Sequence, residues 1–345
     1  CSKTNKSKPE EDFSEVIGQA QAKRGLEIAA AGNHHCLMIG PPGCGKSMLA
    51  KRFNNILPEL SFDQAIETTK IYSVSGLLKE TLITESPLRS PHHSSTPVSF
   101  VGGSVPPKPG EVTLAHNGVL FLDELTEFNR FVIEQLRQIT DNKEITLNKG
   151  NRSFTYPADF VLVGACNPCP CGYLGDRHKS CVCSPYQIQR YISKLSGPLL
   201  DRIDIHLQLN RLSKEELYEL TNHEHKNNVE NKQEQNSNTV SSTNMRANVL
   251  KARRYKRHRL EDSKKYHEFF LEKETREFFH EAVSSLDLSA RSHNKIMKIS
   301  RTIADLAESE VIKLEHIAEA LQYRSIKWEE YYKTGGSSKG VFEYS

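Results

Sequence analysis

The fold class of this sequence is decided by one stretch, Gly40-Pro41-Pro42-Gly43-Cys44-Gly45-Lys46-Ser47. It matches the phosphate-loop pattern G-x-x-x-x-G-K-S/T at every fixed position. The apolar run 36–39 precedes it and the helix-like stretch 47–53 follows, which is the strand–loop–helix setting that the pattern requires. We therefore expect Lys46 to reach the β- and γ-phosphates of a nucleotide and Ser47 to bind Mg²⁺. The alternative, a chance glycine-rich turn, is disfavoured by these flanking elements.

Polar residues follow two further buried-strand candidates. Residues 119–122 run into Asp123 and Glu124, and residues 160–165 lead to Asn167. Strands that alternate with helical stretches predict an α/β fold with a parallel sheet, in which ligands bind at the carboxyl ends of the strands. Asp123 would then support Mg²⁺, Glu124 would orient and polarise the attacking water, and Asn167 would position that water. The alternatives are a helix cap for the acidic pair and a strand-ending turn for Asn167.

The composition of the chain gives no argument for binding nucleic acid or a membrane. The chain has 345 residues, with 46 Lys and Arg against 43 Asp and Glu, so its net charge of +3 is too small to argue nucleic-acid binding. Its longest apolar runs, 118–122 and 160–166, are far shorter than the roughly 20 residues that cross a bilayer. The sequence opens at Cys1 without a signal segment, so we expect a cytoplasmic protein with no membrane partner.

The rest of the chain divides by composition. Residues 1–12 are expected to be flexible, 13–210 to form the α/β domain, 211–244 to be a polar connection, 245–330 to be helical, and 331–345 to be a flexible tail. Helices are expected at 245–259, 272–285, 289–307 and 314–324. Two stretches interrupt the α/β domain: 86–110 is too long for an ordinary connection, and 144–158 has the pattern of a hairpin.

Five of the eight cysteines fall within residues 166–183. Cys169, Cys171, Cys181 and Cys183 form two C-x-C pairs, whose four thiolates can complete a closed structural Zn²⁺ site. Free thiols and then disulfides are the alternatives in a reducing compartment. Cys166 is expected to be a small core residue on its strand.

Together these elements resemble the AAA+ ATPases, and specifically the magnesium-chelatase-like ComM/YifB family. The similarity covers residues 12–324, and the Lon-protease-like N-terminal domain of the family has no counterpart in this sequence. The residues that carry the resemblance are Val16-Ile17-Gly18-Gln19, the phosphate loop, Ser90-Pro91-His92-His93, Ala115-His116-Asn117-Gly118, Leu122-Asp123-Glu124, Asn167-Pro168-Cys169-Pro170-Cys171-Gly172 and Leu200-Asp201-Arg202.

The resemblance implies roles for particular residues. Asn167 would be sensor 1, Arg202 the arginine finger that acts on a neighbour's nucleotide, and Arg291 the sensor-2 arginine of the helical lid. For Arg202, a surface salt bridge to Asp201 or Asp204 is the alternative. The nucleotide-binding residues would be Val16, Ile17 and Gly18 around the adenine, and Gly43, Cys44, Gly45, Lys46, Ser47 and Met48 around the phosphates.

The resemblance also implies ATP and Mg²⁺ as cofactors, a hexameric ring, and DNA branch migration during natural transformation. The stretches 86–110 and 144–158 would be the helix-2 insertion and the pre-sensor-1 hairpin, projecting into the pore. Lys108, Lys149 and Arg152 could then contact DNA phosphates, whereas an ordinary solvated turn is the alternative.

Two other features carry no site assignment. The run 251–259 holds six Lys and Arg residues, but a solvated helix face or a subunit contact explains it equally well. His92 and His93 are expected to pack against or brace a loop, and the alternative is that they are ligands or catalytic residues. A chelatase-like or chaperone-like remodeller of a protein partner remains an alternative function. A non-catalytic, ATP-gated ring is disfavoured by the intact Glu124 and Arg202.

Overall fold

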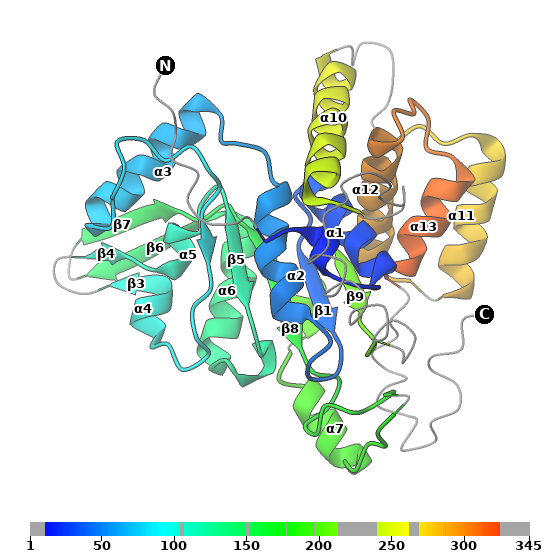
Figure 1. Cartoon of the computed structure of the whole chain (residues 1–345), viewed down its shortest axis with the longest axis horizontal. Coiled ribbons are helices and arrows are strands. Elements are labelled where there is room, and N and C mark those ends of the chain that lie inside the picture. Colours follow the sequence, from blue (N-terminus) through cyan, green and yellow to red (C-terminus); the bar gives the residue numbers. More distant parts are fainter. Residues whose placement is uncertain are drawn as a thin grey trace, which may run out of the picture.

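The computed structural model describes residues 11–103, 107–149, 152–176, 178–195, 197–212, 240–261, 269–286 and 288–324, with Lys149 described by its backbone only. The centre of the molecule is a parallel sheet with the strand order β2-β5-β8-β1-β9 (Figure 1). Its strands are β1 Cys36–Ile39, β2 Leu88–Arg89, β5 Val119–Leu122, β8 Val161–Cys166 and β9 Ile205–Gln208. The predicted α/β class with a parallel sheet is confirmed.

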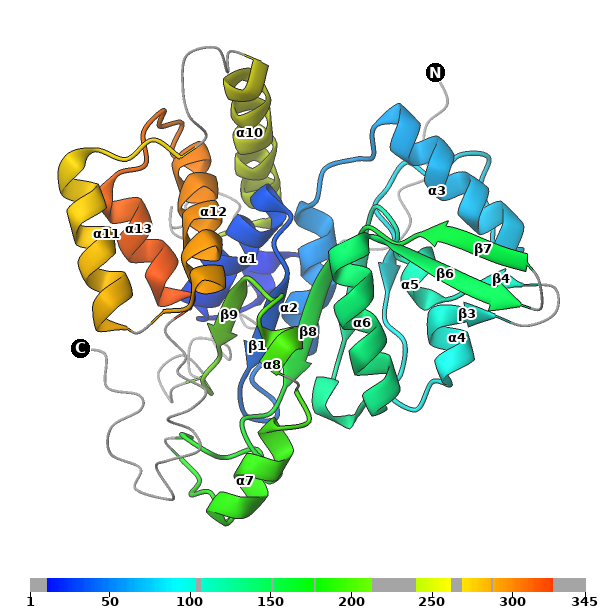
Figure 2. The ribbon, with the colours of Figure 1, turned by 180° about the vertical axis from the view of Figure 1, so that it is seen from behind.

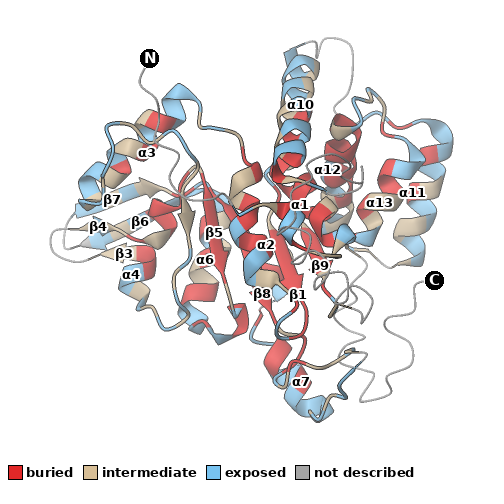
Figure 3. Ribbon diagram, in the orientation of Figure 1, coloured by how far each residue is buried: buried red, intermediate tan, exposed pale blue. Residues whose placement is uncertain are grey.

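The three central strands β5, β8 and β1 are buried along their whole length, which explains their continuous apolar sequences (Figure 3). Side chains alternate between the two faces of the sheet. Cys36 and Met38 belong to a core that includes the helices α1 Ala20–Gly32 and α2 Lys46–Phe53. Leu37 and Ile39 belong to a second core that includes α6 Arg130–Asn142. Helices therefore cover both faces.

The predicted helices of the C-terminal region are present as α10 Ser242–Glu261, α11 Lys273–Ser285, α12 Ala290–Leu306 and α13 Leu314–Gln322. Their apolar side chains share one core with α1 and the sheet, and in both views the helices lie on the side of the sheet that ends in β9 (Figures 1 and 2).

Helix α10 begins within the expected connection, because Ser242 is anchored there. The Oγ of Ser242 accepts from Phe13 N at 2.8 Å, and its N–H donates to the Asp12 carboxylate. Asp12 is thus held in place, although the sequence assigned it to a flexible segment. Residues 1–10, 213–239 and 325–345 of the expected flexible or connecting segments lie outside the described residues.

The stretch 86–110 is not a pure insertion, because it contains β2, an edge strand of the main sheet. The two-residue strand lies between Pro87 and Pro91 and leaves no periodic signal in the sequence. The segments that follow are α4 Pro97–Val101, β3 Gly102–Gly103 and β4 Lys108–Pro109, and α5 Glu111–Leu114 comes next. The hairpin predicted at 144–158 is formed by β6 Glu144–Lys149 and β7 Arg152–Pro157.

The two interrupting segments lie against each other. The Tyr156 hydroxyl on β7 donates to Pro107 O at 3.4 Å, and Leu147 on β6 packs close to Gly102. In both views they form one end of the molecule with α3 Phe62–Ser75, opposite the helices α11–α13. The remaining elements are the short 3-10 helices Phe13–Glu15, Asn54–Ile56 and Leu125–Glu127, and the helices α7 Pro185–Ile192 and α8 Gly197–Leu200.

Candidate nucleotide site and cysteine cluster

The phosphate loop has the backbone that a phosphate cradle requires. Gly43 and Gly45 have φ values of +78° and +91°, a region that L side chains rarely adopt. A Cβ atom at either position would meet no atom within 4 Å, so glycine is needed here for its conformation rather than for space. Gly45 caps the N-terminus of α2, whose partial positive charge favours an anion. The cradle therefore fits a nucleotide phosphate.

Lys46 and Asn167 meet at this loop. The Lys46 Nζ donates to Gly40 O at 2.6 Å, to Pro41 O at 2.9 Å and to Asn167 Oδ1 at 3.1 Å. The contact arises because β1 and β8 are parallel neighbours with Ile39 opposite Cys166, so both chains leave the sheet at the same edge. The lysine of the loop and the amide after β8 are thus placed to face one phosphate group.

Ser47 and Asp123 supply two oxygen atoms at one point. The Ser47 Oγ donates to Asp123 Oδ2 at 2.5 Å, and Asp123 Oδ1 accepts from Glu124 N at 2.9 Å. A hydroxyl and a carboxylate beside a phosphate cradle are the donors that Mg²⁺ takes in phosphoryl-transfer sites. The residues present therefore fit Mg²⁺.

Glu124 has a left-handed backbone with φ +50° and ψ +47°. Such a conformation is uncommon for a residue other than glycine. Its carboxylate lies 3.2 Å from His93 Nδ1, and the His93 ring lies 4.1 Å from that of His92. The sequence favoured a packing or loop-bracing role for His93 over a catalytic one. Its approach to Glu124 follows from the pairing of β2 with β5, which brings both carboxyl ends together.

An open cavity of about 520 Å³ lies beside Glu124 and Asn167. Its other wall includes Arg190, Tyr191 and Lys194 from α7 and the turn after it. Sequence reasoning missed these cations, because α7 is placed by the loop after β8 and not by a spacing within the motif.

The residues expected around the adenine lie at the entrance to α1. Val16 is buried, Gly18 and Gln19 have left-handed backbones, and the Gln19 side chain donates to Asn210 O at 2.6 Å. Ile17 is half-buried. Of the two remaining nucleotide candidates, Met48 on α2 is exposed, whereas burial raises the pKa of Cys44 above that of an ordinary thiol.

Arg202 is held within its own chain, but by neither of the carboxylates that the sequence suggested. Its Nε lies 3.0 Å from both oxygens of Asp141 on α6, and its Nη1 donates to Pro198 O at 2.7 Å. Arg291, at the start of α12, pairs with Asp201 at 3.4 Å. The described contacts of Arg291 therefore lead to the segment before Arg202 and not to the phosphate loop.

Asp204 instead joins the sheet to the C-terminal helix α12. It contacts His34 at 3.2 Å and also pairs with Lys295 on α12. Burial alone would raise the pKa of Asp204, but the hydrogen bond from His34 and the charge of Lys295 outweigh burial and hold that pKa well below its usual range.

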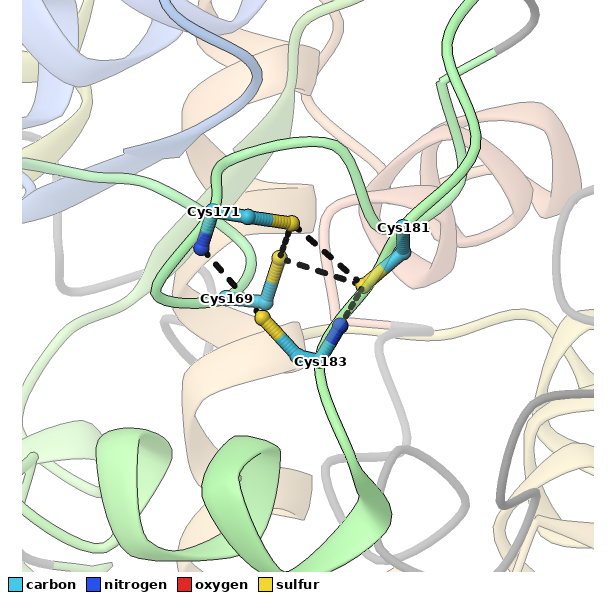
Figure 4. Close-up of side chains that lie close together, drawn as sticks. All are labelled: Cys169, Cys171, Cys181 and Cys183. Carbon is cyan, nitrogen blue, oxygen red and sulfur yellow. Dashed lines mark hydrogen bonds between the residues drawn. The ribbon is translucent and has the colours of Figure 1, made fainter.

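The four cysteines of the two C-x-C pairs converge in the loop between β8 and α7 (Figure 4). All are free thiols, and their sulfur atoms lie within 4.8 Å of one another. The sulfur of Cys169 is 3.3 Å from that of Cys171 and 3.6 Å from that of Cys181. Four sulfurs around one Zn²⁺ at 2.3 Å are about 3.8 Å apart in a tetrahedron. The donor set therefore fits zinc.

Backbone N–H groups also point at these sulfurs: those of Cys171 and Cys183 donate to Cys183 and Cys181, each at 3.4 Å. Burial alone would raise the pKa of Cys171, but hydrogen bonds from the backbone of Tyr173 and Val182 outweigh it and lower the pKa to about 6. Cys166 is a buried residue on β8, as expected.

The residues expected to contact DNA lie on the two interrupting segments. Lys108 and Arg152 are exposed there, whereas the Lys149 side chain lies outside the described residues. The basic run 251–259 is partly committed to packing. Arg253 donates to Ala30 O, and Arg259 pairs with Asp305.

A phosphate loop after β1, an acidic pair after β5 and an amide after β8, followed by C-terminal helices, define a P-loop nucleotide-binding fold of the AAA+ class. Comparison with known proteins identifies the family. The profile described as magnesium chelatase, subunit ChlI, matches residues 12–217, and that of its C-terminal part matches residues 239–324. The chain belongs to this magnesium chelatase ChlI family, as the sequence motifs predicted.

Among its relatives, the uncharacterized protein YifB of Escherichia coli is 41% identical over 327 residues, which cover 91% of this chain and 60% of YifB. The competence protein ComM of Haemophilus influenzae is 40% identical with the same coverage. The magnesium-chelatase 38 kDa subunit of Rhodobacter capsulatus is 25% identical over 47% of this chain and 52% of that protein. The chain thus spans about 60% of the length of the first two relatives.

Among the residues that the structure describes, no helix combines the length and apolar character that a bilayer span needs.

Proposed function

We propose that this chain is the ATP-hydrolysing core of a cytoplasmic ring motor that acts on DNA, a ComM-like branch-migration helicase or translocase in homologous recombination during natural transformation. The observation that carries the proposal is the joining of the two interrupting segments at one end of the molecule, where Lys108 and Arg152 are exposed. Cations on adjacent loops can bind successive phosphates of a strand. The similarity to a competence protein supports the same function.

For the chemistry, Lys46 would bind the terminal phosphates, and Ser47 and Asp123 would hold Mg²⁺. When bound there, Mg²⁺ would neutralise charge on the phosphates. Glu124 would orient the attacking water and accept its proton, with Asn167 beside the γ-phosphate. The contacts Lys46–Asn167 and Ser47–Asp123 support this division of roles.

The ring would complete each site. Arg202 would act on the nucleotide of the neighbouring subunit in a hexamer, and its bonds to Asp141 would fix the direction of the guanidinium. Arg291 would approach the nucleotide from the lid in its own subunit. The segment Val16, Ile17 and Gly18 would contact the adenine.

We also propose that Cys169, Cys171, Cys181 and Cys183 hold a structural zinc ion. The spacing of the four sulfurs and the backbone N–H groups directed at them support this assignment.

A second candidate function is the remodelling of a protein partner. The family match to magnesium chelatase and the similarity to its 38 kDa subunit favour this candidate. Exposed basic loops on a ring would then contact acidic segments of a protein instead of DNA.

The rate of ATP hydrolysis with and without single-stranded or branched DNA separates the two functions. A DNA motor predicts a rate that rises several-fold with DNA and is abolished in Glu124→Gln. Hydrolysis that is indifferent to every DNA tested would contradict the proposal and favour the protein remodeller. Absence of hydrolysis would contradict both.

A further inference from the structure

The cysteine cluster lies directly against the nucleotide site. Cys169 follows Asn167 by two residues and is completely buried. Asn167 in turn accepts the hydrogen bond from Lys46 of the phosphate loop. The first ligand of the cluster therefore fixes the chain just beyond the amide that faces the phosphates.

A second contact joins the cluster to the phosphate loop itself. Gly172, next to Cys171, has a φ of +82°, and a Cβ atom there would lie 2.6 Å from Pro42 Cδ. The Gly172 N–H donates to Cys169 O at 2.9 Å, which closes the turn between the two ligands. The turn that presents the first two sulfurs thus rests on Pro42 without room for a side chain.

On its other side, the cluster segment contacts the residues that follow β9. Asp176 pairs with Arg211 at 3.0 Å, and the Arg211 guanidinium lies 5.1 Å from the centre of the Tyr173 ring. The segment 169–183 therefore contacts the phosphate loop at one end and the residues that follow β9 at the other.

Little apolar packing holds this segment in place. Of its four cysteines, Cys169 alone is buried, in a small cluster with Ile188, Tyr191 and Ile192 of α7, and Leu174 and the other three cysteines pack against this cluster only partly buried. Val182, between two of the ligands, is 86% exposed. A short segment with so small a core depends on a cross-link for its order.

We propose that zinc in the cysteine cluster holds Gly172 against Pro42 and Asn167 beside Lys46, so that zinc occupancy sets the affinity of the phosphate loop for nucleotide. This inference rests on the proposed nucleotide site and adds a metal-dependent control to it. Without zinc the turn at Gly172 is no longer held in place. Its contact with Pro42 and the position of Asn167 beside Lys46 are then lost.

The test measures bound zinc by mass spectrometry and the Kd of a fluorescent ATP analogue with Mg²⁺ on the same samples. Reduced wild-type protein should carry one zinc per chain. Cys181→Ser/Cys183→Ser should lose the zinc and bind nucleotide at least tenfold more weakly. The matched control is Val182→Ala, which changes the exposed residue between these ligands and should keep both zinc and affinity.

Removal of zinc from the wild-type protein with a chelator, followed by its return, guards against a variant that fails to fold. Affinity should fall on removal and recover with zinc, with circular dichroism monitoring the overall fold. Gly172→Ala separates contact from ligation, since it should keep zinc but weaken nucleotide binding.

Three results would overturn the inference: wild-type protein without zinc, equal affinities with and without zinc, or a loss of affinity that returned zinc does not reverse. Equal affinities would leave the nucleotide site itself intact. A zinc-loaded wild-type protein that binds no nucleotide would overturn the proposed function as well.

Discussion

Glu124 combines a strained backbone with an exposed carboxylate beside the phosphate loop. Its neighbour Asp123 faces Ser47, so the two carboxylates of the pair point to different tasks. The chain leaves β5 at Leu122 and turns at the left-handed Glu124 into the 3-10 helix Leu125–Glu127.

We expect Glu124→Gln to lower kcat for ATP hydrolysis by roughly 10²–10⁴-fold, since it removes a general base but keeps the shape of the side chain. Nucleotide binding, measured by fluorescence titration, should persist. Glu127→Gln is the matched control, because Glu127 lines the same cavity as Glu124 and pairs with Lys194. Equal loss of kcat in both variants would argue against the role of Glu124.

At this scale the sequence was sufficient where a motif fixes the spacing. The positions of Lys46, Ser47 and Asp123 were predictable from a phosphate loop and a second strand. His93 and Arg190 were not. His93 follows a two-residue edge strand that carries no periodic pattern. Helix α7 does have apolar residues at helical spacing, but nothing local to it shows that Arg190 lines the same cavity as Glu124.

Among the structural elements, α12 is joined to the sheet by Asp204. This carboxylate lies between His34 and Lys295 with only 17% of its side chain exposed. Removing one partner of a buried ion pair leaves the other charge uncompensated, which costs about 3–5 kcal/mol.

Asp204→Asn should therefore lower the free energy of unfolding by about 3 kcal/mol at neutral pH. Because folding lowers the pKa of Asp204, its contribution is complete above the unfolded value of about 3.9 and is lost as pH falls below it. Urea titrations at several pH values check both points. Asp201→Asn is the control, since its pair with Arg291 is exposed and contributes less than about 1 kcal/mol. Equal effects of the two changes at pH 7 would refute the prediction.

The elements differ in how far the sequence revealed them. Helices α10–α13 were predictable from their 3.6-residue apolar period, and β6–β7 from alternation around a polar turn. The start of α10 was not, because Ser242 is fixed by Asp12, 230 positions away in the sequence. Long-range contacts of this kind leave no local pattern.

For the whole molecule, the position of Arg202 raises the question of whether it acts within its own subunit or on a neighbour. Its bonds to Asp141 and Pro198 O are internal. A trans role requires the assembled ring.

Mixing two inactive proteins answers this question. Arg202→Ala and Glu124→Gln should each fail to hydrolyse ATP, whereas their mixture should recover a measurable fraction of wild-type hydrolysis. Recovery is expected because an intact Glu124 in one subunit can face an intact Arg202 from its neighbour. A mixture as inactive as its components, with mixed rings shown by cross-linking, would restrict Arg202 to its own subunit.

DNA is assigned as the substrate because the two interrupting segments contact each other at one end of the molecule and expose Lys108 and Arg152 there. The most direct measurement compares DNA stimulation of ATP hydrolysis in wild-type protein, Lys108→Ala/Arg152→Ala and Lys143→Ala. Lys143 is an exposed cation at the base of the same hairpin and pairs with Asp159. We predict that DNA stimulates the wild type and the Lys143 variant several-fold, more weakly as salt rises, and that the double variant loses this stimulation. Equal stimulation of all three proteins, or none in the wild type, would contradict the assignment of DNA to these loops.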